Sequence, residues 1–143
     1  MKIRIKSESG KIPAYATEHS SGFDICAYLP DGDFVLAAGD RALIPTGIYI
    51  ELPPGYEAQV RARSGLAIKH GIGLVNGIGT VDSDYRGELK IPLINWGKED
   101  FTIRDNDRIA QVVIAKYEKV SFELADSLNE TERGEGGFGH SGI

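Results

Sequence analysis

Short stretches in which apolar and polar residues alternate, separated by turn-forming residues, run through most of this 143-residue sequence. Residues 2–6 and 56–63 alternate with a period of two, the pattern of a strand that is buried on one face. Residues 41–52, 86–95 and 107–117 are longer and rich in Ile, Val and Leu, which also favours strands. The sequence therefore predicts an all-β protein.

Turn signals separate these stretches, because Gly, Pro, Asn and Asp favour tight bends. They occur at Pro30-Asp31-Gly32, Gly39-Asp40, Pro53-Pro54-Gly55, Asn76-Gly77 and Asp105-Asn106-Asp107. Many short strands at near-regular spacing are typical of a sandwich, jelly roll or barrel, and we expect a distorted jelly-roll-like barrel. One short helix is predicted from Ser64, as its N-cap, to about Lys69.

The C-terminal residues differ in composition from the rest of the chain. Residues beyond about 126 are rich in Gly, Ser, Asn and Glu, and the last ten, GEGGFGHSGI, include five glycines. Glycine loses the most conformational entropy on ordering. We therefore predict an all-β domain over residues 1–126 and a flexible, glycine-rich arm over residues 127–143. Arg133, Phe138 and the bare backbone N–H groups suit this arm to closing over a flat base and its phosphates, and a frayed tail is the alternative.

Charge and cysteine content narrow the possible partners. A net charge of −5 argues against a nucleic-acid-binding protein, which needs a basic face, but allows a nucleotide, which needs only a few placed cations. The single cysteine, Cys26, has no partner within the chain, and we see neither a signal peptide nor a long apolar run. These features predict a cytoplasmic protein with no membrane association.

Five segments carry residue types that suit a nucleotide. They are Ser21-Gly22-Phe23-Asp24, Arg63-Ser64-Gly65-Leu66-Ala67, residues 76–87 (NGIGTVDSDYRG), Arg108-Ile109-Ala110-Gln111, and Arg133 to Gly142. In this order and spacing they resemble the five motifs of the trimeric deoxyuridine triphosphate nucleotidohydrolases (dUTPases). The resemblance implies a homotrimer that uses Mg²⁺ to hydrolyse dUTP to dUMP and pyrophosphate, which keeps uracil out of DNA and supplies dUMP for thymidylate synthesis.

The resemblance also implies how each site is shared and which residues form it. Residues 76–87 come from one chain, the first, second and fourth segments from a second chain, and the C-terminal arm from a third. The implied substrate-binding residues are Arg63, Ser64, Gly65, Asn76, Gly79, Thr80, Val81, Tyr85, Lys90, Gln111, Arg133, Phe138, Gly139, His140 and Ser141.

Residues 76–87 resemble the β-hairpin that holds uracil and deoxyribose in this family, and Asn76-Gly77 is itself a hairpin-turn dipeptide. Hairpin backbone groups meet the uracil edge in a fixed donor and acceptor order. Cytosine presents the reversed order and would leave buried groups unpaired, at a cost of roughly 1–3 kcal/mol each. Tyr85 resembles the tyrosine that packs under the deoxyribose and leaves no room for a 2′-hydroxyl.

Asp82 resembles the aspartate that activates water in this family. A carboxylate with a free-solution pKa of about 3.9 is ionised at neutral pH and can deprotonate a positioned water. Turn capping or an ion pair with Arg86 is the alternative for Asp82 and for Asp84. We expect catalysis at Asp82 and the alternative at Asp84.

The second and fourth segments resemble phosphate-binding motifs. Ser64 and Gly65 stand at the expected helix start, where free N–H groups and the dipole attract anions, although simple capping is an alternative for Ser64. The resemblance gives Ser64 the region between the α- and β-phosphates and gives Gln111 a phosphate contact. We expect Arg108 to form a structural ion pair.

Asp24 resembles an aspartate that reaches Mg²⁺ through water, and pairing with an arginine is its alternative. In the arm, Phe138 is expected to stack on uracil, while Arg133, His140 and Ser141 reach the γ-phosphate.

Three other functions compete with this one. The related deoxycytidine triphosphate deaminases carry a catalytic glutamate shortly after the third motif, and that position falls on Pro92, which cannot transfer protons. A P-loop hydrolase would need Gly-Lys-Ser/Thr followed by a helix, and the C-terminal glycines lack both. A nucleotide sensor or a structural jelly-roll protein stays possible from the sequence, because a pocket alone does not demonstrate turnover.

Overall fold

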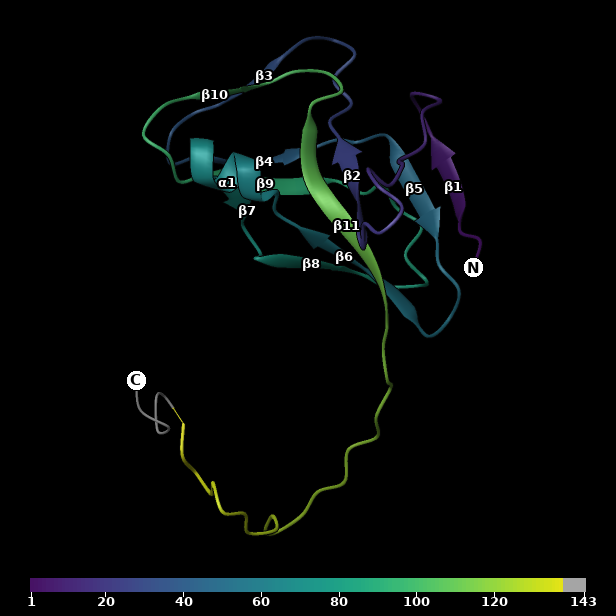
Figure 1. Ribbon diagram of the computed structural model, residues 1–143, viewed down its shortest axis with the longest axis vertical. Helices are drawn as coiled ribbons and strands as arrows, with labels where there is room; N and C mark the ends of the chain where they lie inside the picture. Colours follow the sequence, from purple (N-terminus) through teal and green to yellow (C-terminus); the bar gives the residue numbers. More distant parts are fainter. Residues whose placement is uncertain (138–143) are drawn as a thin grey trace.

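A computed structural model describes residues 1–137 of the chain (Figure 1). Within them the chain forms eleven strands and one short helix, in agreement with the all-β prediction. The elements are β1 (Arg4–Ser7), β2 (Gly22–Cys26), β3 (Phe34–Leu36), β4 (Arg41–Ile44), β5 (Ile48–Glu51), β6 (Tyr56–Arg61), α1 (Ser64–His70), β7 (Ile72–Leu74), β8 (Ile78–Val81), β9 (Ile91–Asn95), β10 (Phe101–Ile103) and β11 (Arg108–Lys116).

The strands are arranged in small antiparallel sheets and do not close into a barrel among the described residues. The largest sheet has the order β2-β11-β6-β8, and a second has the order β4-β9-β7. Two further pairs, β1-β5 and β10-β3, complete the body. β11 lies at the centre of the largest sheet and pairs with both β2 and β6 (Figure 1).

Alternating side chains build the core between these sheets. In β9, for example, Ile91, Leu93 and Asn95 are buried while the residues between them are half-buried. Asn95 is satisfied there, because its Nδ2 donates to the carbonyls of Leu36 (3.0 Å) and Glu99 (2.8 Å). The largest fully buried apolar side chains are those of Ile25, Leu36, Ile44, Ile72, Leu74, Ile91, Leu93, Ile103, Ile109 and Val112.

Two of the longer predicted strands are shorter or interrupted. The predicted strand over 41–52 is divided into β4 and β5, which belong to different sheets. The chain bends between them at Gly47, whose φ of +64° is a conformation that L side chains rarely adopt. Of residues 86–95, only Ile91–Asn95 forms a strand. The prediction over 107–117 is confirmed by β11.

The helix is where the sequence places it, but its cap is different. α1 begins at Ser64 and ends at His70, so Ser64 is its first helical residue and the predicted N-cap is wrong. Arg63 is the N-cap residue, and no side chain caps the helix. Arg63 has an extended backbone, and its carbonyl accepts the Ala67 N–H at 3.0 Å.

Asn76-Gly77 forms a tight turn, but it is not the turn of a hairpin. Gly77 has a φ of +69°, and its N–H donates to the Leu74 carbonyl at 3.1 Å. The flanking strands are not partners, because β7 pairs with β9 whereas β8 pairs with β6. This turn therefore carries the chain from one sheet to the other.

The chain leaves the body after β11. Residues 117–135 are exposed, and Figure 1 shows them running away from the sheets. Residues 117–137 are called the C-terminal segment below. No helix within residues 1–137 has the length and apolar character that a membrane crossing requires.

Candidate active site

A cavity of about 240 Å³ lies beside β8, and it is called the β8 cavity below. It brings together seven of the site residues predicted from the sequence, which are Asn76, Gly79, Thr80, Val81, Asp82, Tyr85 and Lys90. Sequence reasoning missed five further lining residues, Leu43, Val60, Glu88, Leu89 and Pro92. Leu43, Val60 and Leu89 appear in the sequence only as strand-forming residues, and Pro92 was considered only as the position of the deaminases' catalytic glutamate.

β8 lines this cavity with Gly79, Thr80 and Val81. It pairs with β6 in antiparallel register, with Gly79 opposite Val60. A Cβ at Gly79 would lie 3.2 Å from the Val60 Cβ and 3.3 Å from the Asn76 Nδ2, so a larger residue would disturb this wall. β8 is the last strand of its sheet within residues 1–137. Its outer edge therefore offers N–H and C=O groups to the edge of a flat base.

Asp82 follows β8 directly at the mouth of the cavity. The side chain is exposed, and within residues 1–137 its carboxylate forms no ion pair or hydrogen bond. The Asp82 carbonyl accepts the Tyr85 N–H at 3.2 Å, which closes the turn. The carboxylate is thus free to accept a proton from water.

Asp84 does not form the ion pair with Arg86 that the sequence suggested. Arg86 instead donates to the carbonyls of Ser83 (2.7 Å) and Tyr85 (2.9 Å). These bonds fold the residues after Asp82 into a compact turn. Arg86 therefore stabilises the turn through backbone carbonyls, and Asp84 remains exposed.

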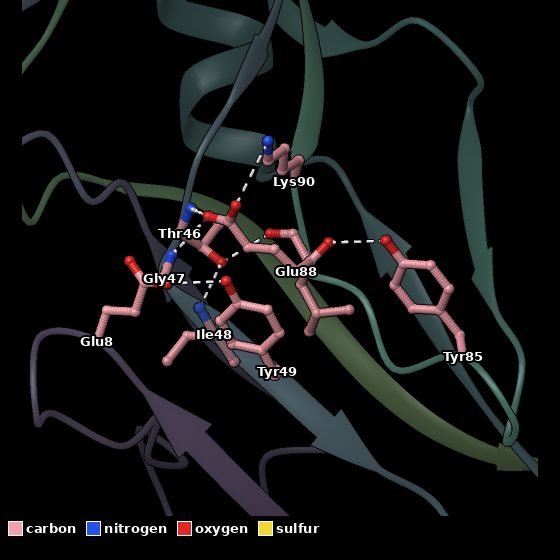
Figure 2. A network of polar contacts seen from close by, with 9 residues as sticks. Glu8, Thr46, Gly47, Ile48, Tyr49, Tyr85, Glu88 and Lys90 are labelled. Carbon is pink, nitrogen blue, oxygen red and sulfur yellow. Dashed lines mark hydrogen bonds and ion pairs between the residues drawn. The ribbon is translucent and has the colours of Figure 1, made fainter.

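Glu88, which also lines the β8 cavity, is held by a network of polar contacts (Figure 2). Its Oε1 accepts hydrogen bonds from the N–H groups of Thr46 (3.0 Å) and Gly47 (2.9 Å). Its Oε2 lies 3.5 Å from the Lys90 Nζ. Sequence reasoning missed Glu88, and the only available signal was an acidic residue between the third segment and a strand.

A second group of predicted residues gathers around Asp24 and is called the arginine cluster below. Asp24 Oδ1 lies 3.1 Å from Arg63 Nε, and Asp24 Oδ2 lies 3.1 Å from Arg108 Nη1. Arg63 also donates to the Arg108 carbonyl at 3.0 Å. The ion pair expected for Arg108 is confirmed. Asp24 does pair with arginine, the alternative that the sequence left open.

Gln111 belongs to the same region. It lies opposite Asp24 in the β11–β2 register. A Cβ at Gly22 would lie 2.7 Å from the Gln111 Cγ, so the glycine makes room for this side chain. Ser64 and Gly65 are exposed in the first turn of α1, next to Arg63. The cluster thus holds two arginines, one amide and the start of α1.

The two groups do not share a cavity. None of Asp24, Arg63, Ser64, Gly65 and Gln111 lines the β8 cavity. A larger cavity of about 340 Å³ is lined by Asp24, Cys26 and Arg108 together with the N-terminal residues 9 and 11–16. Among the residues that the structure describes, Asp24 is the only predicted site residue in it. Burial, followed by the charge of Asp24, raises the pKa of the Cys26 thiol above its usual value.

The predicted residues of the arm are only partly described. Arg133 Nε donates to the Gly136 carbonyl at 2.7 Å, so its contacts are local. Phe138, Gly139, His140 and Ser141 lie outside the described residues.

Comparison with known proteins decides the family. The dUTPase family model matches residues 8–142. The chain belongs to the dUTPase family. A deoxyuridine 5′-triphosphate nucleotidohydrolase of Finegoldia magna is 52% identical over 143 residues, which cover 99% of each chain. Another dUTPase, from Rickettsia felis, is 54% identical over 140 residues, which cover 98% of this chain and 94% of the relative.

Solved dUTPases share the fold. The dUTPase of Staphylococcus bacteriophage 80alpha, solved with dUPNHPP, superposes with a TM-score of 0.85 at 24% identity, covering 99% of both chains. The jelly-roll-like architecture expected from the sequence is therefore confirmed. Membership of the dUTPase family also confirms the reaction, hydrolysis of dUTP to dUMP and pyrophosphate, over deamination and over binding without turnover.

Proposed function

We propose that this dUTPase uses Asp82 as its general base, holds the nucleoside in the β8 cavity, and completes each active site from more than one copy of the chain. The observation that carries the proposal is the β8 cavity, where the Asp82 carboxylate, which pairs with nothing in residues 1–137, lies together with six other predicted residues.

The nucleoside is recognised by backbone and by one ring. The outer edge of β8 and the amide of Asn76 offer the fixed donors and acceptors that distinguish uracil from cytosine. The walls formed by Val60 and Val81 leave the base little room for a methyl at C5. The Tyr85 ring lines the same cavity and excludes a ribose 2′-hydroxyl by contact with the sugar.

Asp82 activates the attacking water. Its ionised carboxylate accepts a proton from water, and the oxygen of that water attacks the α-phosphorus. The bond between the α-phosphorus and the bridging oxygen to the β-phosphate then breaks, and pyrophosphate leaves with the electron pair. The proton passes from Asp82 to solvent, which restores the base. Asp82 is exposed, so water reaches it directly.

Cations and amides from the other regions hold the triphosphate. Arg63, Gln111, Ser64 and Gly65 form one group that presents guanidinium, amide and backbone N–H donors. In the arm we assign Arg133, His140 and Ser141 to the γ-phosphate, and Phe138 and Gly139 to the base. Binding of the arm closes the site and strengthens these charge contacts by excluding water.

Mg²⁺ fits the arginine cluster as a cation that is held largely by phosphate and water. Residues 1–137 contain no group of three or more His, Cys, Asp or Glu side chains placed to hold a metal. Asp24 has one arginine partner on each oxygen, which leaves lone pairs for metal-bound water. A phage phi11 dUTPase of the same fold, 20% identical with a TM-score of 0.80, coordinates a structural Mg(II) ion. Bound Mg²⁺ would offset the triphosphate charge.

A homotrimer explains why the predicted residues form separate groups in one chain. The β8 cavity holds the nucleoside residues, and the arginine cluster holds the phosphate residues outside it. We propose that residues 76–90 of one copy face the arginine cluster of a second and the arm of a third. Exposed large apolar side chains on the body support burial in an assembly, among them Leu43, Ile68, Ile78 and Trp96. A cytoplasmic location belongs to this proposal and agrees with the free Cys26.

A pyrophosphate-release assay tests the proposal directly. The purified full chain, with Mg²⁺, is incubated with dUTP, dCTP, dTTP and UTP in parallel, and the products are resolved. We expect dUMP and pyrophosphate from dUTP and far lower kcat/KM for the other three. Release of orthophosphate would show attack at a different phosphorus. Equal use of UTP and dUTP would refute the role given to Tyr85.

A further inference from the structure

The ring of Tyr85 rests directly on Gly87. A Cβ at Gly87 would approach the Tyr85 Cε2 to 2.9 Å and the Cζ and hydroxyl oxygen more closely still, distances that real Cβ atoms essentially never show. Gly87 is not among the glycines with positive φ, so its backbone is one that alanine can adopt. The glycine at this position is therefore needed for space beside the ring and not for backbone freedom.

Glu88 holds the same, hydroxyl end of the ring through a hydrogen bond. The Tyr85 hydroxyl donates to the Glu88 carbonyl at 3.1 Å (Figure 2). That carbonyl is itself fixed, because the Glu88 carboxylate accepts two N–H groups from the bend between β4 and β5. The next residue, Leu89, is buried, and its carbonyl accepts the Thr46 hydroxyl at 2.6 Å. The segment beside the ring is thus anchored to the bend between β4 and β5 through Glu88 and Leu89.

We propose that Gly87 and Glu88 form a seat that fixes the Tyr85 ring, and that this seat sets the discrimination between deoxyribose and ribose. Gly87 and Glu88 are specificity-determining positions, and Glu88 acts as a positioning residue through Tyr85. The inference rests on the role proposed above for Tyr85.

The seat is needed because the ring is otherwise free to move. Tyr85 is 46% exposed, so packing covers only part of it. A side chain held on one face alone can change rotamer and admit a larger sugar. Contact of its hydroxyl end with Gly87 and a hydrogen bond from its hydroxyl to the Glu88 carbonyl limit that rotation. Discrimination by a ring requires this fixed placement, since a shift of about 1 Å makes room for a hydroxyl.

The first test is a double-mutant cycle between Gly87→Ala and Tyr85→Ala. Steady-state kinetics give the ratio of kcat/KM for UTP to that for dUTP in the four proteins. We expect Gly87→Ala to raise this ratio by about tenfold in the natural chain, because the added methyl displaces the ring. In the Tyr85→Ala background the same substitution should leave the ratio unchanged. A backbone effect of Gly87→Ala would act equally in both backgrounds.

The second test separates the two functions of Glu88. Glu88→Gln keeps an oxygen that accepts the Thr46 and Gly47 N–H groups and loses only the charge beside Lys90, so the ratio should stay near that of the natural chain. Glu88→Ala removes the anchor and should raise the ratio. Tyr85→Phe and Tyr49→Phe form a matched pair, since each removes one hydroxyl, and Tyr49 bonds to Glu8 away from the β8 cavity. Only Tyr85→Phe should raise the ratio.

Thermal melts of all variants identify any that fail to fold, and the Gln and Phe variants preserve the test if Gly87→Ala is unstable. The seat is overturned if Gly87→Ala and Tyr85→Phe leave the ratio unchanged in folded protein, or if Gly87→Ala acts equally without the Tyr85 ring. If the natural chain itself uses UTP as well as dUTP, the role of Tyr85 fails and the seat fails with it.

Discussion

The wall of the β8 cavity that Glu88 and Leu89 form and the C-terminal segment supply complementary parts of the proposed site. Contacts within the chain fix the wall in place but leave the C-terminal segment exposed. Glu88, whose side chain is only 15% exposed, and the buried Leu89 fasten the wall to the bend between β4 and β5. In the C-terminal segment, Phe122 is 95% exposed and Leu124 is 100% exposed. The described hydrogen bonds around Arg133 and Gly134 reach no further than three residues along the chain.

This difference indicates that one region is organised before substrate arrives and the other is organised by binding. A wall that the core already holds costs little entropy when the nucleoside enters. An exposed, glycine-rich segment must lose conformational entropy when it closes, so substrate contacts have to compensate for that loss.

Replacing Asp82 with Asn should remove the base while leaving the wall in place. We expect kcat for dUTP to fall by about 10²–10⁴-fold with little change in affinity, because the carboxylate acts mainly in the transition state. Steady-state kinetics and binding of a non-hydrolysable dUTP analogue measure the two effects. Asp84→Asn is the matched control, since Asp84 is exposed in the same turn, and it should retain nearly full activity. A near-normal rate for Asp82→Asn would contradict the mechanism.

Deleting residues 132–143 should reduce turnover without disturbing the wall of the β8 cavity. Residues 132–135 are exposed, so we expect the fold and the trimer to survive while kcat falls by about 10²-fold through loss of positioning. The measurements are kinetics, a thermal melt and native mass, which should stay near three chains. Turnover at the full rate would show that the arm is only a frayed end. An active monomer would overturn the shared site.

Replacing Arg133 with Ala should weaken the triphosphate end alone. A charge-assisted hydrogen bond to the γ-phosphate is lost, so we expect kcat/KM for dUTP to fall by roughly 10- to 100-fold. The dissociation constant for dUMP should barely change, because dUMP has no γ-phosphate. Calorimetric titration with dUMP beside dUTP kinetics makes the comparison. An equal loss for both ligands would place Arg133 at the nucleoside instead.

The sequence predicted local features well but predicted poorly which strands pair with each other. The period-two pattern identified β6, and the longer apolar stretch identified β11, because burial of one or both faces leaves a direct pattern. The same reasoning joined β4 and β5 into one strand, since apolar content does not reveal that Gly47 turns the chain into another sheet. The Asn76-Gly77 turn was likewise found, while the partners of its flanking strands were not.

The candidate site shows the same division. Residues 76–87 were predicted as a group because their chemistry is contiguous in sequence, and all six predicted site residues among them line the β8 cavity. Glu88 was missed because its importance depends on the N–H groups of Thr46 and Gly47, which are more than 40 residues away in sequence. Whether Asp24 pairs with arginines or with metal-bound water also depends on side chains from three separate elements. Sequence pattern specifies such long-range polar contacts only weakly.

The smallest expected effect is a change in Tm, compared between one substitution beside the cavity wall and one in the C-terminal segment. Thr46→Val removes a buried hydroxyl that donates to the Leu89 carbonyl and accepts the Ile48 N–H at 3.2 Å. Leaving the Leu89 carbonyl and the Ile48 N–H without this partner should lower the free energy of unfolding by roughly 1–2 kcal/mol and lower Tm by about 3–8 °C. Thr131→Val removes a hydroxyl that accepts the Gly134 N–H at 3.1 Å in the exposed segment, and its Tm should match that of the natural chain. Melts at one protein concentration compare the two. Equal Tm losses would mean that the C-terminal segment is held as firmly as the cavity wall, and the contrast between the two regions would be wrong.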